Sequence, residues 1–99
     1  MMYEHAEALG VARSHLAALS LTSLTVDAAS AYSQALIQLD WIHDGAVSPI
    51  ELDGLPEDRD ALFKGAVEAI RDLEQYGIDP LRLEVLIHAV RHACGLDQP

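Results

Sequence analysis

Apolar residues recur every three or four positions along most of the chain, and strict alternation of apolar and polar residues is nearly absent. This spacing gathers apolar side chains on one face of a helix. We therefore predict an all-α protein in which residues 1–99 form one domain, a compact bundle of about four helices. The predicted helices span residues 3–21, 26–43, 56–76 and 80–94. The expected inward positions include Leu9, Leu16, Tyr32, Leu39, Phe63 and Ile70, whereas Glu4, Glu7, Arg13 and Ser14 are expected to point away.

The junction between the third and fourth predicted helices carries the clearest local signals. Gly77 favours the left-handed conformation that ends many helices, Asp79 is a typical N-cap, and Pro80 suits the first helical position. So short a connection predicts that these two helices form a C-terminal antiparallel hairpin. Gly95 is expected to end the last helix. Thr25 is the predicted N-cap of the second helix.

The least regular part of the chain follows Asp44-Gly45, which we expect to end the second helix. Within it, Ser48-Pro49-Ile50-Glu51 matches a capping box, with Ser at the cap, Pro in the first turn and Glu three residues on. We predict one short helical turn there, ended by Gly54. The third helix then begins at about Pro56.

Composition and charge exclude several classes of function. The 99 residues are 51% hydrophobic and carry a formal net charge of −10, from six basic and sixteen acidic residues. A negative field of this size repels phosphate backbones and anionic lipids, so we predict neither nucleic-acid nor membrane binding. The longest uncharged stretch near the N-terminus, residues 14–26, falls short of the roughly 20 residues that span a bilayer.

The N-terminal residues lack the basic segment and apolar run of a secretory signal. The lone Cys94 cannot form an internal disulfide, which suits a reducing compartment. We therefore expect a cytoplasmic protein, and no cofactor is indicated.

Histidines offer two candidate sites. Glu84, His88 and His92 recur every four residues, a spacing that brings two imidazoles and a carboxylate within reach of one zinc ion. However, His88 and Glu84 lie within the polar arc of the fourth helix and His92 lies at its edge, which favours a solvated face over a metal site. His43 lies at the margin of the apolar stripe of its helix, with Asp40 on the same turn. It is either a partly buried structural histidine or a proton-transfer group in a small enzyme subunit.

Acidic residues cluster between the second and third helices. The cluster comprises Asp44, Glu51, Asp53, Glu57, Asp58 and Asp60, with Arg59 as its one base. Carboxylates in the first turn of a helix are stabilised by its dipole, which accounts for Glu57, Asp58 and Asp60 in part. The alternative is that Glu51, Asp53, Glu57, Asp58 and Asp60 form a docking patch for a basic protein.

An indole lies on the polar side of the second helix. Ile37 and Trp41 are one turn apart there, among Ser30, Ser33, Gln34 and Gln38. Either another part of the chain covers this ridge of Ile37 and Trp41, or the ridge is an apolar anchor for a second copy or another protein. The second interpretation is suggested because Trp is enriched among binding hot spots.

Two classes of small, acidic, helical protein resemble this chain in outline. Acyl carrier proteins hold a prosthetic arm on the Ser of an Asp-Ser-Leu motif at a helix start, and the nearest string here, Thr22-Ser23-Leu24, lacks the Asp. We therefore do not assign that identity. Bacterial immunity proteins and antitoxins are also often small, acidic and helical, but this likeness is one of composition only and no sequence motif supports it. We expect a non-enzymatic protein-binding module, a homodimer acting as a regulator, an antitoxin-like inhibitor or an accessory subunit.

Overall fold

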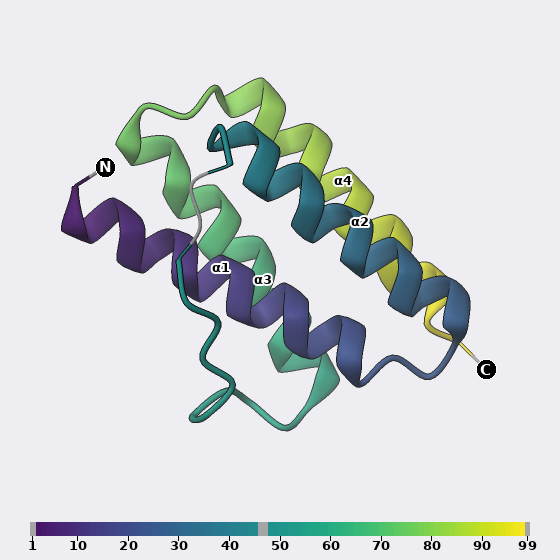
Figure 1. Cartoon of the computed structure of the whole chain (residues 1–99). Helices are drawn as coiled ribbons and strands as arrows, with labels where there is room; N and C mark the ends of the chain where they lie inside the picture. The colour runs from purple at the N-terminus through teal and green to yellow at the C-terminus, as the bar shows by residue number, and fades with distance from the viewer. Residues whose placement is uncertain (1, 46–47, 99) are drawn as a thin grey trace.

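The computed structural model describes residues 2–45 and 48–98, and these residues form helices and connections with no strand (Figure 1). The predicted all-α class is therefore confirmed. The elements are α1 (Tyr3–Leu21), α2 (Val26–Ile42), α3 (Arg59–Asp72), a 3₁₀ turn η1 (Leu73–Tyr76) and α4 (Pro80–Leu96). None of the helices described is both long and apolar enough to cross a lipid bilayer.

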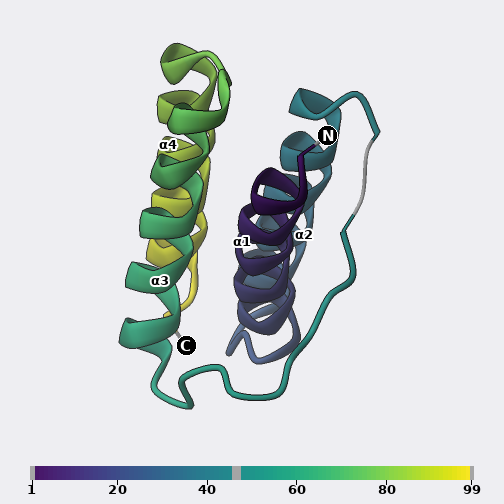
Figure 2. The ribbon, with the colours of Figure 1, turned by 90° about the vertical axis from the view of Figure 1, so that its left-hand side faces the viewer.

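The helices form two layers of two, with α1 and α2 in one layer and α3 and α4 in the other (Figure 2). Across the layers, α1 packs against α3 and α2 packs against α4, whereas α1 and α4 lie diagonally across the bundle from each other. Each helix is antiparallel to the neighbours that it contacts (Figure 1). The predicted α3–α4 hairpin is confirmed.

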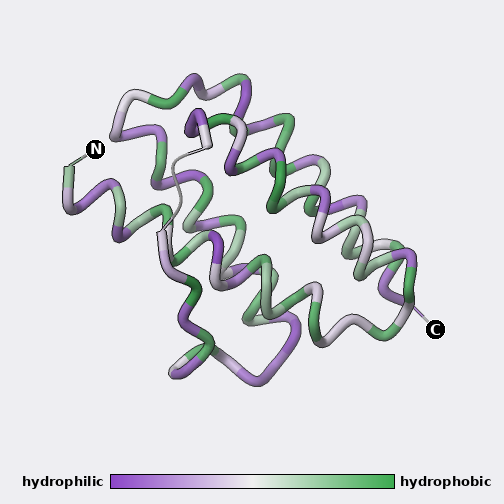
Figure 3. Tube along the Cα trace, in the orientation of Figure 1, coloured by the Kyte–Doolittle hydropathy of each residue, from purple (hydrophilic) through white to green (hydrophobic). Residues whose placement is uncertain are grey.

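The core lies between the two layers and is built from the predicted stripes. Leu9 and Leu16 of α1, Leu39 of α2 and Ile70 of α3 are fully buried. Apolar and polar segments follow one another along each helix in the hydropathy trace, as expected for helices with one buried face (Figure 3). Phe63, also expected inside, is only partly buried at the edge of the core.

The connection 48–58 is extended, and the helical turn predicted at Ser48-Pro49-Ile50-Glu51 is wrong. The Ser48 hydroxyl donates to the carbonyl of Ala6 in α1, at 2.7 Å, instead of accepting a hydrogen bond within its own segment. The backbone N–H of Glu51 donates to the Ser14 hydroxyl at 2.9 Å. The segment thus runs along α1, whose side chains satisfy its polar groups in place of a local turn.

This packing also changes the outer face of α1. Ser14, expected to face solvent, is buried beneath the connection 48–58. Arg13 is partly buried and donates to the carboxylate of Asp40 in α2 at 2.8 Å and to the Ser48 carbonyl. A polar residue opposite the core stripe is exposed only if no other segment covers that side of the helix.

Two helix boundaries differ from the prediction by a few residues. α3 begins at Arg59 rather than near Pro56, because the Asp58 carboxylate accepts from the backbone N–H of Ala61 and caps the helix. α4 continues to Leu96, with Gly95 inside the helix rather than ending it.

The junction before α4 has the predicted form. Gly77 has φ of +88°, in the left-handed region that favours glycine, and Asp79 accepts from the backbone N–H of Leu81 at 3.0 Å. Pro80 is the first residue of α4. The last four residues of the predicted third helix, Leu73–Tyr76, tighten into η1 before Gly77.

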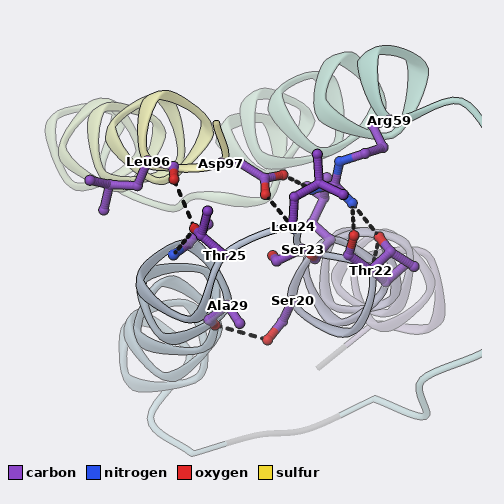
Figure 4. Close-up of polar contacts among 12 residues, drawn as sticks. Ser20, Thr22, Ser23, Leu24, Thr25, Ala29, Arg59, Leu96 and Asp97 are labelled. Carbon is purple, nitrogen blue, oxygen red and sulfur yellow. Dashed lines mark hydrogen bonds and ion pairs between the residues drawn. The ribbon is translucent and has the colours of Figure 1, made fainter. Parts of the chain in front are cut away.

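A polar cluster joins all four helices at the opposite end of the bundle (Figure 4). Thr25, the predicted N-cap of α2, accepts from the backbone N–H of Ala28 and donates its hydroxyl proton to the carbonyl of Leu96. Asp97 accepts from the backbone N–H of Leu24 at 2.7 Å and forms an ion pair with Arg59. The α1–α2 loop is thereby tied to the end of α4 and the start of α3.

Candidate protein-docking groove

An open groove of about 650 Å³ lies between α2 and α4, and exposed apolar side chains line both of its walls. Trp41 of α2 is 79% exposed and Ile37, one turn earlier, is 50% exposed. From α4, Leu81 is 72% and Val85 is 61% exposed. Scattered exposed apolar residues are ordinary, whereas four large ones gathered along one groove make this groove the candidate for a binding surface.

Helical geometry explains why these residues face outward. In α2, Tyr32, Ala35 and Leu39 fill the inner face, which leaves Ile37 and Trp41 on the outer one. The ridge predicted from the sequence is therefore not covered by another described segment.

Sequence reasoning missed the second wall of the groove. In α4, Leu83, Leu86 and Val90 fill the inner face, which leaves Leu81 and Val85, spaced i and i+4, outside the core stripe. This i, i+4 spacing of two apolar residues was the signal in the sequence that could have identified the second wall. Only the antiparallel packing of α2 on α4 shows that both apolar pairs share one groove.

The charge of the groove differs from the charge of the chain. Among the described residues that line it, the charged ones are Asp44, just past the end of α2, and Arg82, in the first turn of α4. Their formal charges sum to zero, whereas the whole chain carries −10. The apolar surface therefore coincides with a region of balanced charge.

The predicted acidic docking residues lie elsewhere. Glu51 and Asp53 line a separate pocket of about 530 Å³ beside α1, together with Tyr3 and Glu7. Asp58 is the N-cap of α3, where its carboxylate has a structural role. The described part of the structure thus separates the apolar pair from the acidic residues that were expected to act with it.

Two other acids of the predicted patch, Glu57 and Asp60, are exposed on either side of the Asp58 cap. Asp60 lies in the first turn of α3, where the helix dipole stabilises a negative charge. These two acids do not line the groove between α2 and α4.

The predicted metal ligands Glu84, His88 and His92 are all exposed on α4. The Glu84 carboxylate lies 3.9 Å from the guanidinium of Arg71 on α3. Within residues 2–45 and 48–98, no group of three His, Cys, Asp or Glu side chains is placed to hold a metal ion. A zinc site at these residues stays a prediction, which calorimetric titration of zinc into His88→Ala and the unmodified protein tests.

His43 is buried, with 6% of its surface exposed, and both ring nitrogens have partners. Nδ1 lies 2.9 Å from the Leu39 carbonyl, to which it donates, and Nε2 lies 3.0 Å from Nε2 of His5. The His5 ring stacks on Tyr76, with ring centroids 4.9 Å apart. Asp40, on the same turn as His43, pairs with Arg13.

The surroundings of His5 change the pKa of its ring. Burial, and secondly the charge of His43, lowers the pKa of His5 from its ordinary value of 6.5. The His43 ring lines neither the α2–α4 groove nor the pocket beside α1. A catalytic role for His43 stays a prediction, and the contacts described here are those of a structural histidine pair.

No protein-family model, curated protein or solved structure matches this chain.

Proposed function

We propose that this protein is a non-enzymatic protein-binding module and that the groove between α2 and α4 is its contact surface. The observation that carries the proposal is the 79% exposure of the Trp41 ring beside Ile37, Leu81 and Val85. Leaving apolar surface in water costs about 25 cal/mol per Å². A partner that covers this surface recovers that free energy, and Trp contributes strongly to many interfaces.

The groove is suited to tight contact because its side chains stand on regular helices. Trp41 and Ile37 belong to α2, Leu81 and Val85 belong to α4, and the partly buried Ile42 and buried Leu86 form part of the lining. Surfaces held by packed helices lose less conformational entropy on binding than loops do. A groove between two helices also accepts an apolar helix face, a common mode of recognition between proteins.

The charge of the chain favours a protein over a nucleic acid as the partner. Sixteen acidic residues against six basic ones create a field that opposes phosphate-bearing ligands. Glu51 and Asp53 line a separate pocket, outside the groove. They can speed the approach of a basic protein. A regulator, an antitoxin-like inhibitor or an accessory subunit is a function that fits this division of the surface.

Site-specific photo-crosslinking tests the proposal. A benzophenone amino acid replaces Trp41, which keeps an aromatic ring at the groove, and cells that express the variant are irradiated. A matched variant carries the same group in place of Glu68, an exposed residue of α3 that does not line the groove. We expect protein adducts from position 41 and far fewer from position 68. Equal yields from the two positions would show that the groove is not a binding surface.

A further inference from the structure

The two charged residues of the groove stand at the same end of the bundle. Asp44 follows the C-terminal end of α2, and Arg82 lies in the first turn of α4, which is antiparallel to α2 (Figure 1). Within the part of the chain that the structure describes, neither side chain takes part in an ion pair. The groove therefore presents one acid from its α2 wall and one base from its α4 wall, both at the same end of the bundle.

This arrangement is self-complementary under a two-fold rotation. Consider an axis that lies in the plane of contact and runs parallel to the two helices. Rotation about it places α2 of one copy over α4 of the other, without shifting either along its length. Asp44 then faces the partner's Arg82, and Arg82 faces the partner's Asp44, as an isologous interface requires. Trp41 faces the partner's α4, at the level of its exposed apolar residues.

We infer that the occupant of the groove is a second copy of this chain, joined in a two-fold dimer through α2 and α4. This inference rests on the proposed function, because it names the partner of the same groove. Two copies that each carry a formal charge of −10 repel one another wherever their acids meet. The groove is where the lining charges cancel, so two copies can approach there without bringing unbalanced acids together.

A basic partner fits this groove less well than a second copy does. The favourable charge for a basic protein lies with Glu7, Glu51 and Asp53 in the pocket beside α1, outside the groove. In the groove such a partner meets one acid and one base, which gives no net attraction. Self-complementarity of both charge and apolar surface thus favours a second copy.

Charge reversal tests the two-fold pairing. Sedimentation equilibrium gives the dimer dissociation constant of the unmodified protein, Asp44→Arg, Arg82→Asp and the double variant. Each single reversal places like charges opposite each other twice per dimer, and we expect it to raise the dissociation constant about tenfold or more. The double variant restores both pairs with reversed polarity at an unchanged net charge, so its dissociation constant should return to within about threefold of the original.

Mixing the two single variants gives an independent measurement. In a mixed dimer, the new base at position 44 of one chain faces the new acid at position 82 of the other, and the remaining pair is the original Arg82 with Asp44. The mixture should therefore associate more tightly than either variant alone. Asp72→Arg, an exposed change on α3, alters the net charge as Asp44→Arg does and is the control for general repulsion. It should not weaken the dimer.

Three results would overturn the inference: a monomer at every concentration, single variants that associate like the unmodified protein, or no recovery in the double variant and the mixture. Circular dichroism of each variant shows that loss of association is not loss of folding. If the chain is monomeric while position 41 crosslinks to a different protein, the dimer is refuted and the protein-binding function stands. If position 41 also gives no specific adduct, both are refuted.

Discussion

A close contact between α1 and α3 makes a quantitative prediction about stability. Gly65 of α3 faces His15 of α1, and a Cβ atom added at Gly65 would lie 2.6 Å from Nε2 and 2.8 Å from Cδ2 of that ring. The ring is buried and is held by a 2.8 Å hydrogen bond between its Nδ1 and the carbonyl of Val11. Gly65→Ala therefore forces the imidazole to move against its own hydrogen bond.

The expected cost follows from two opposing effects. To reach ordinary contact, the ring must shift by roughly 0.8 Å, and overpacking of a buried site costs about 1–3 kcal/mol. Replacing a glycine within a helix by alanine stabilises the folded state by about 0.5–1 kcal/mol. The difference between these effects lies between about 0 and 2.5 kcal/mol, so we expect Gly65→Ala to lower the free energy of unfolding by about 1 kcal/mol.

Urea denaturation followed by far-UV circular dichroism measures this change, and the chain offers a matched control. Gly95 lies in α4, where an added Cβ meets no atom within 4 Å, so Gly95→Ala should stabilise the protein. In a His15→Ala background the clash is absent, and Gly65→Ala should cease to destabilise. If Gly65→Ala is as stable as Gly95→Ala in the unmodified background, the close approach of α1 and α3 is not as described.

Three further predictions concern the groove, the histidine pair and the polar cluster. Trp41→Ala should reduce the free energy of unfolding by less than about 1 kcal/mol, against about 3–5 kcal/mol for a buried Trp, because the ring is largely exposed; a larger loss in urea denaturation would place it in the core. Because folding lowers the pKa of His5, the unfolded chain binds protons more readily, so the free energy of unfolding should fall as the pH drops below about 6.5. A His5→Gln variant should lose part of this pH dependence, and identical curves would refute the role of His5. Asp97→Ala leaves Arg59 without its ion-pair partner and should cost about 1–3 kcal/mol, with faster hydrogen exchange in the last turn of α4; unchanged exchange would count against the cluster.

Local signals predicted the parts of the fold that local contacts determine. The conformation of Gly77 and the caps at Asp79 and Thr25 depend on hydrogen bonds within a few residues, and each formed as expected. Ser48 matched a local pattern equally well, yet its hydroxyl bonds to Ala6, 42 positions away in the chain. A capping box therefore predicts a helix only where no distant backbone group competes for the same side chain.

The candidate site could be predicted from the sequence only in part, for the same physical reason. Periodicity places Trp41 opposite the core stripe of its own helix, but whether another element covers the ring is decided by tertiary packing. Leu81 and Val85 contribute to the groove because α2 pairs with α4. The spacing of residues within one helix does not reveal which helices pair. Charge totals likewise predicted an acidic surface without locating the neutral part of it.

The distribution of charge, more than its total, connects the fold with the proposed function. A chain with a formal charge of −10 would be expected to repel its own copies, although its exposed indole favours association. Here the acids beside α1 are held at the pocket lined by Glu51 and Asp53, outside the α2–α4 groove, and the connection 48–58 that carries them is fastened to α1 by Ser14 and Arg13. The groove is thereby left with one acid and one base. The proposed dimer would therefore use a surface separate from Glu51 and Asp53, and would leave those acids free to attract a basic protein.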